Sequence, residues 1–128
     1  MQKILIASLT GGALLFSTAA FADLAGELST AQTHAGLAAK GADINAVHMH
    51  LHHALNCLVG PGGTGFDTTN ANPCASAGKG ILVDSTDAGQ KAKLQAAVAD
   101  ANKGLAATDL AAAQAAANDT ATAIGGAK

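Results

Sequence analysis

The fold of this chain is decided by residues 44–59, INAVHMHLHHALNCLV. The apolar residues of this stretch recur at spacings of 3, 4, 4 and 3, which is the period of a helix and not the alternation of a strand. They are Ile44, Val47, Leu51, Leu55 and Leu58. The stretch therefore predicts an amphipathic helix with histidines on both sides of its apolar stripe.

Glycine, proline and aspartate divide the rest of the chain into segments of helical length. Gly41 and Gly104 are expected to end helices, and so is Gly60-Pro61, because glycine adopts the left-handed conformation and proline cannot continue a helix. Alanine-rich helices are expected at about residues 23–40, 43–59, 87–103 and 109–124. The chain is therefore expected to be all-α, with residues 23–128 forming one antiparallel four-helix bundle of two helical hairpins. A homodimer of two-hairpin chains with the same packing is the alternative.

A glycine-rich segment, residues 61–86, joins the two predicted hairpins. It is expected to form a lid on the bundle, with Phe66 and residues 81–83 packed beneath it. Cys74 lies in this segment and Cys57 in the preceding helix, with 16 residues between them. In an exported chain this spacing favours a disulfide, worth about 3 kcal/mol for a loop of this size. The alternative is that Cys57 is a thiolate metal ligand.

The first 22 residues have the features of a secretory signal peptide. Lys3 supplies a positive charge, residues 4–16 form an apolar run, and Ala20-Phe21-Ala22 matches an A-x-A cleavage site. Their removal leaves 106 of the 128 residues, with six lysines, no arginine and nine acids, and hence a net charge of −3. We therefore expect a periplasmic or secreted protein with no nucleic-acid partner and no membrane span after cleavage.

Four of the five histidines lie within six consecutive positions, residues 48–53. His48 and His52 lie at i, i+4 on one flank of the apolar stripe, a spacing that lets two imidazoles on one helix bind one metal ion. In an antiparallel hairpin, His34 on the preceding helix lies level with this pair. The expected site is therefore His34, His48 and His52, with Met49 as a candidate fourth ligand. The thioether of Met49 favours copper, and zinc and nickel are the alternative metals.

The two remaining histidines are expected on other faces of the same helix. His50 lies on the opposite flank, and His53 is expected to point to solvent. At i, i+3 the two could form a second, more exposed metal site. One solvated histidine needs no function, but five histidines beside a single glutamate, Glu27, favour metal binding. The sequence contains no H-E-x-x-H motif, so no enzymatic activity is expected.

The stretch THAGLAAKGADINAVHMHLHHALN, residues 33–56, resembles the hairpins of small periplasmic histidine-rich metal-binding proteins built as alanine-rich four-helix bundles. The resemblance implies binding or buffering of copper, nickel or zinc without catalysis. This chain departs from that pattern in its second hairpin, where residues such as Ala97 and Gln114 replace histidine, and in its disulfide-closed lid. One or two defined sites therefore fit better than high-capacity storage.

Two further functions stay open on the sequence alone. One is a haem-binding bundle in which histidines are axial ligands, although the chain lacks a C-x-x-C-H motif and keeps only one aromatic residue, Phe66, after signal cleavage. The other is a structural or interaction module whose histidines sense pH. An absorption spectrum would distinguish the three functions by a Soret band, a weak metal band or neither.

Overall fold

A computed structural model describes residues 22–128 of the chain. Over this range the protein is all-helical, as expected, with four long helices and one single-turn helix. These are α1 (Leu24–Ala39), α2 (Ile44–Val59), α3 (Ile81–Asp84), α4 (Ala88–Ala106) and α5 (Leu110–Gly125). Of these helices, none has both the length and the hydropathy needed to cross a bilayer. The predicted signal peptide, residues 1–22, lies outside the described residues except for Ala22.

Each long helix begins after an aspartate whose carboxylate accepts a hydrogen bond from a backbone N–H in the first turn. These N-cap residues are Asp23, Asp43, Asp87 and Asp109. The carboxylate satisfies a donor that the helix leaves free, and its charge lies at the positive end of the helix dipole. Aspartate is therefore the local signal that sets all four helix starts, and the expected ranges begin at these same residues.

Gly104, which was expected to end a helix, instead lies inside α4, which continues to Ala106. A Cβ at Gly104 would lie 2.5 Å from Cδ1 of Leu51 on α2 and 3.3 Å from Cβ of Ala116 on α5. Glycine is required here by the close approach of three helices. The expected helix end was wrong because a glycine needed for packing and a glycine needed for a left-handed turn look the same in a sequence.

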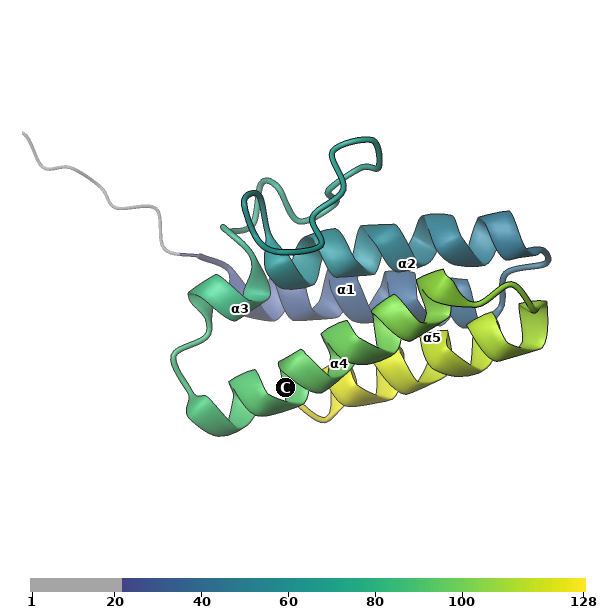
Figure 1. The fold of residues 1–128 in the computed structure, drawn as a ribbon. Coiled ribbons are helices and arrows are strands. Elements are labelled where there is room, and N and C mark those ends of the chain that lie inside the picture. Colours follow the sequence, from purple (N-terminus) through teal and green to yellow (C-terminus); the bar gives the residue numbers. More distant parts are fainter. Residues whose placement is uncertain (1–21) are drawn as a thin grey trace, which may run out of the picture.

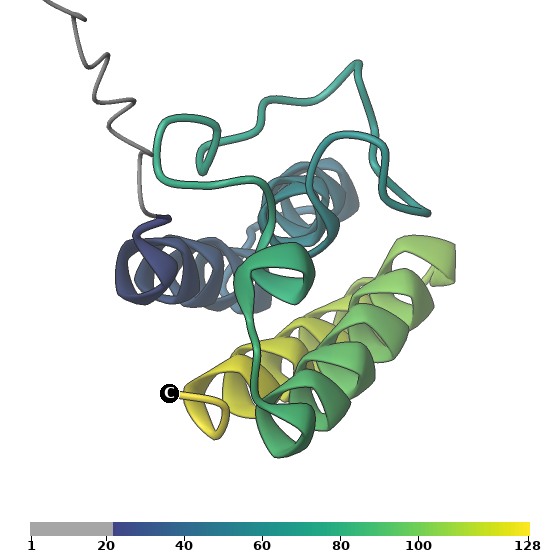
Figure 2. The same cartoon turned by 90° about the vertical axis from the view of Figure 1, so that its left-hand side faces the viewer.

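The four long helices form two pairs, α1 with α2 and α4 with α5 (Figure 1). α1 also packs along α5, and α4 along α2, and α2 and α5 make a smaller contact with each other. The segment between α2 and α3 runs over the side of α2 that faces away from α4 and α5 (Figures 1 and 2). α3 contacts α1, α2 and α4 and closes one end of the molecule.

The core consists of alanine and branched aliphatic side chains. Its largest fully buried members include Leu51, Leu58, Leu94 and Ile124. Between them lie alanines with no exposed surface, which let neighbouring helices approach closely. They are Ala31, Ala35, Ala38, Ala54, Ala97, Ala101, Ala113 and Ala117.

Cys57 and Cys74 form the predicted disulfide, with their Cα atoms 5.2 Å apart. Both residues are buried, and the bond ties the last turn of α2 to the lid. Neither sulfur is therefore a free thiolate, which rules out Cys57 as a metal ligand.

The lid differs from the expectation at its end. Residues 81–83 were expected to pack together beneath it, and Ile81 is indeed fully buried. Val83, however, is 59% exposed. The reason is that these residues form the helical turn α3, in which side chains two positions apart point in different directions.

Gly60, which follows α2, and Gly80, which precedes α3, meet backbone to backbone. Their φ angles are 68° and 119°, in the region that favours glycine. A Cβ at Gly80 would lie 2.7 Å from Cα of Gly60. Both residues must therefore be glycine for the lid to close over the end of α2.

Gly80→Ala is expected to lower the free energy of unfolding by more than about 1 kcal/mol, because alanine would be strained at this φ and would overlap Gly60. The matched control is Gly36→Ala inside α1, where a Cβ would have nothing within 4 Å. That control is expected to raise stability by about 0.5–1 kcal/mol. Denaturant unfolding of both variants provides the measurement, and a neutral Gly80→Ala would contradict the close approach.

Candidate metal site

The structure places the four histidines of α2 on two flanks of the helix. His50 and His53 face α1, where they meet His34. His48 and His52 face the other way, toward the turn after α4 and the lid. Spacings of i, i+3 and i, i+4 account for the two pairs.

His34, His50 and His53 form a compact cluster of half-buried imidazoles, here called the histidine triad. One nitrogen from each ring lies within 4.8 Å of the others, and no other group of three histidine, cysteine or acidic side chains among residues 22–128 meets this condition. Nδ1 of His34 lies 3.3 Å from Nδ1 of His50. The ring of His53 stands edge-on to both, with centroid distances of 5.0 and 5.7 Å.

The separation of His34 and His50 fits a tetrahedral metal ion. With metal–nitrogen bonds of 2.0–2.1 Å, two ligand nitrogens of a tetrahedron lie about 3.3 Å apart. The Nδ1 atoms of His34 and His50 are separated by 3.3 Å. Nδ1 of His53 is buried and has no hydrogen-bond partner, which leaves its bonding capacity unused. One nitrogen from each of the three rings could therefore hold a metal ion.

The surroundings of the triad favour the neutral imidazole that a metal needs. Burial lowers the pKa of His34, and the charges that His53 and His50 would carry lower it further. Burial likewise lowers the pKa of His53, with additional contributions from His50 and His52. His34 and His53 therefore resist protonation, mainly because burial disfavours the charged form and also because nearby imidazoles would repel a second proton.

The grouping expected from the sequence, His34 with His48 and His52, does not occur. Nε2 of His48 lies 3.1 Å from the carbonyl oxygen of Ala107, and Nδ1 of His52 lies 3.3 Å from Oδ2 of Asp67. A helical wheel defines the two flanks of α2 but cannot tell which flank neighbours α1. This choice depends on how the hairpin packs against α4 and α5.

His53 also differs from the expectation, because it points toward α1 and not to solvent. It lies about 60° from His50 around the helix, close enough to share the flank that α1 covers. Met49 is 43% exposed and precedes His53 by one turn, at i, i+4. Met49 therefore lies on nearly the same side of α2 as His53, one turn earlier.

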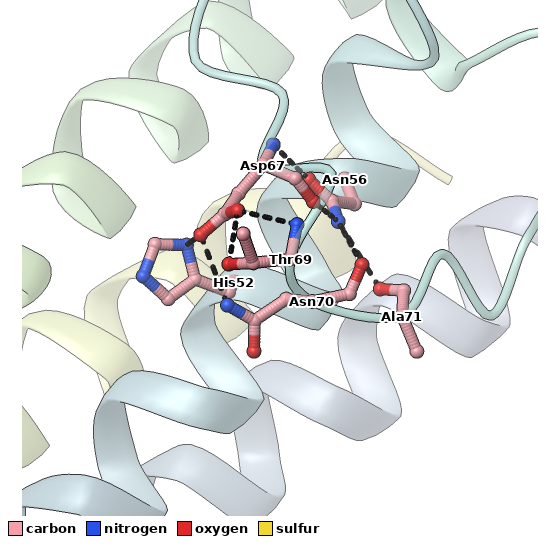
Figure 3. Close-up of polar contacts among 6 residues, drawn as sticks. All are labelled: His52, Asn56, Asp67, Thr69, Asn70 and Ala71. Atoms are coloured by element: carbon pink, nitrogen blue, oxygen red, sulfur yellow. Dashed lines mark hydrogen bonds and ion pairs between the residues drawn. The ribbon is translucent and has the colours of Figure 1, made fainter.

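The flank of α2 that carries His52 holds the lid through Asn56 (Figure 3). The Asn56 side chain is fully buried, and its Nδ2 donates hydrogen bonds to the carbonyl oxygens of Asp67, Asn70 and Ala71 at 2.9, 3.2 and 3.1 Å. Its Oδ1 accepts a bond from the N–H of Asp67 at 2.9 Å. One side chain thus satisfies four backbone groups of the lid.

Asp67 connects this network to His52 (Figure 3). Hydrogen bonds from the hydroxyl and N–H of Thr69 and from the Asn70 side chain lower the pKa of Asp67 to about 2, and His52 contributes in the same direction. The approach of His52 Nδ1 to Asp67 lacks the alignment of a hydrogen bond, so the contact is electrostatic. Sequence reasoning missed Asn56 and Asp67, although an asparagine inside an apolar helical stretch is a signal for such a buried anchor.

Comparisons with protein-family models, with curated proteins and with solved structures found no match to this chain. The resemblance to small periplasmic histidine-rich metal-binding proteins therefore stays a prediction. Arguments for function rest on the chemistry of the triad and its surroundings.

Without metal, the protein is expected to lose stability as the pH falls below the ordinary histidine pKa of 6.5. The unfolded chain takes up protons at this value, whereas folded His34 and His53 do so only at lower pH. Their contribution is thus present above pH 6.5 and is lost as the pH falls through the lowered values. Urea unfolding between about pH 7.5 and pH 5 measures the effect, given the spread of histidine pKa values in proteins.

The control for this pH dependence is the double variant His34→Asn/His53→Asn, which should show a shallower slope over the same range. Nuclear magnetic resonance titration of the ring protons assigns the individual midpoints. Midpoints for His34 and His53 at or above 6.5 would contradict the burial argument.

Proposed function

We propose that this chain is an exported transition-metal-binding protein whose metal site is formed by His34, His50 and His53. The observation that carries the proposal is the convergence of three imidazoles from α1 and α2, with two Nδ1 atoms 3.3 Å apart. In this proposal residues 1–22 are a signal peptide, and the four long helices form one antiparallel bundle in the periplasm or outside the cell. The protein acts by sequestering or delivering its metal, without catalysis.

A metal accounts for features of the triad that a purely structural role leaves unexplained. A hydrogen bond between His34 and His50 would satisfy one nitrogen of each ring. It would leave the buried Nδ1 of His53 without a partner. An ion bound through this nitrogen would give it a partner and would offset the cost of burying the imidazoles together.

The chemistry of the donor set favours copper. Imidazole nitrogen suits copper, zinc and nickel alike, whereas thioether sulfur prefers copper(I). Met49 lies one turn before His53 on nearly the same side of α2. Rotation of its flexible side chain would let it reach a fourth position on the ion, so copper is the proposed metal and zinc or nickel the alternatives.

His48 and His52 are a second, weaker candidate for metal binding. Each ring has one nitrogen beside a protein acceptor, Ala107 O for His48 and Asp67 for His52. Histidine ligands commonly have such an outer partner, which leaves the other nitrogen free to bind metal. With only two nitrogens at i, i+4, this pair would bind more weakly than the triad.

Replacing any member of the triad by alanine is expected to weaken copper(II) and zinc(II) binding strongly, because each variant removes one of three protein ligands. The expected loss is about a hundredfold or more, above the 10–100-fold typical of an outer-shell partner. The matched controls are His48→Ala and His52→Ala on the same helix, for which a loss of less than about tenfold is expected. Calorimetric titration of each variant at neutral pH gives the affinities.

Other outcomes of the same titrations point to other functions. Equal losses at all five histidines would indicate a flexible chelating segment in place of a defined site. A Soret band in protein purified from its native compartment would favour haem, and the absence of any metal binding would favour a pH-sensing module.

Met49→Leu is expected to weaken copper(I) binding while leaving zinc(II) binding unchanged. Leucine keeps the size and apolar character of methionine but removes the sulfur that copper(I) prefers. Competition with a coloured copper(I) chelator measures the first affinity, and calorimetry measures the second. A parallel loss for both metals would mean that Met49 shapes the site without binding the ion.

A further inference from the structure

Glu27, the only glutamate of the chain, is a carboxyl group with no exposed surface. It lies in the first turn of α1, and its Oε1 accepts a hydrogen bond from the N–H of Gly80 at 3.1 Å. Its Oε2 is buried and has no partner when the group is taken as a carboxylate. A buried charge in this position requires either a cation or a proton.

The neighbour of Glu27 is a second acid, Asp84 on α3. The two carboxyl groups approach each other beside Gly78, and Oδ2 of Asp84 accepts a bond from the N–H of Lys79 at 2.7 Å. Gly78 lies between them, where an added Cβ would be 2.6 Å from Oε1 of Glu27 and would also meet Oδ2 of Asp84. Two carboxylates can only accept hydrogen bonds, so this contact needs a proton on one of them.

The charges around Glu27 favour its protonated form. Burial is the main cause that raises its pKa, and the negative charges of Asp84 on α3 and Asp23 at the start of α1 raise it further. The hydrogen bond from Gly80 acts in the opposite direction. Lys79, in the segment packed against Glu27, contributes its backbone N–H to Asp84.

We propose that Glu27 and Asp84 share one proton in the folded protein and that this proton latches residues 78–84, the end of the lid, to α1. The protonated Oε2 of Glu27 donates to Asp84, which satisfies the one oxygen left without a partner. The latch rests on these contacts alone and does not depend on metal binding at the triad.

Loss of the shared proton is expected to separate residues 78–84 from α1. Two adjacent carboxylates repel each other, and Glu27 has no exposed surface through which water could stabilise its charge, so ionised Glu27 favours separation of α3 from α1. The rest of the lid stays attached, because the Cys57–Cys74 disulfide and Asn56 hold it to α2. The expected opening is therefore local and reversible.

The pH dependence of the latch has the opposite sign to that of the triad. The folded-state pKa of Glu27 lies above its ordinary value of 4.5. Its contribution to stability is therefore complete below pH 4.5 and is lost as the pH rises through the raised folded-state value.

Because the chain has a single glutamate, the proposal can be tested on one signal. In protein labelled with ¹³C-glutamate, the side-chain carboxyl resonance should titrate with a midpoint above 4.5. The backbone amides of Lys79 and Gly80 should lose hydrogen-exchange protection over the same pH range, while amides in the middle of α2 keep theirs.

Glu27→Gln supplies the variant test, because the amide donates to Asp84 and accepts from Gly80 but cannot ionise. Protection of the Lys79 and Gly80 amides should then persist through the range in which it is lost in the natural protein. Asp119→Asn, on the exposed face of α5, is the control and should leave the glutamate midpoint unchanged. A glutamate midpoint at or below 4.5, or equal loss of protection with glutamine at residue 27, would overturn the proposal. If the glutamine variant does not fold, the midpoint of the glutamate titration in the natural protein still tests the proposal.

Discussion

The close approach of α1 to α2 is the constraint on which the rest of the structure depends. Ala31, Ala35 and Ala38 present no surface to solvent and place only methyl groups between α1 and its neighbours. Larger side chains there would push the helices apart. His34 reaches the imidazoles of α2 because of this packing, so the same small residues that build the core also create the histidine triad.

The two flanks of α2 contact different parts of the protein. One flank, with His50 and His53, meets α1 and forms the candidate metal site. The other carries His52 and Asn56 and holds the lid by hydrogen bonds, while the disulfide at Cys57 holds it covalently. A helix with a single apolar stripe can make both sets of contacts because its polar positions lie on either side of that stripe.

Two groups of opposite pH dependence lie on α1, His34 in the triad and Glu27 in the latch. Acid protonates the triad and would release a metal, whereas base ionises Glu27 and loosens the end of the lid. The triad therefore favours the folded protein at higher pH and the latch at lower pH. Both effects follow from burial, which opposes the charged form of an acid and of a base alike.

The sequence by itself determined the elements that depend on local chemistry. Aspartate at residues 23, 43, 87 and 109 sets the helix starts, and the spacing of apolar residues sets the face of α2. The two cysteines, together with the expectation of export, predict one disulfide. Each of these is settled by residues within a turn or a loop of one another, or by the only pairing available.

Only the tertiary structure decided which residues meet across helices. The flank of α2 that faces α1 follows from how two hairpins pack together, so His34 joins His50 and His53 and not the predicted His48 and His52. Gly104 lies inside α4 for the same kind of reason, because its neighbours come from α2 and α5. The Glu27–Asp84 contact joins residues 57 positions apart through a single helical turn. Such contacts depend on the sum of packing over the whole core, which no local pattern contains.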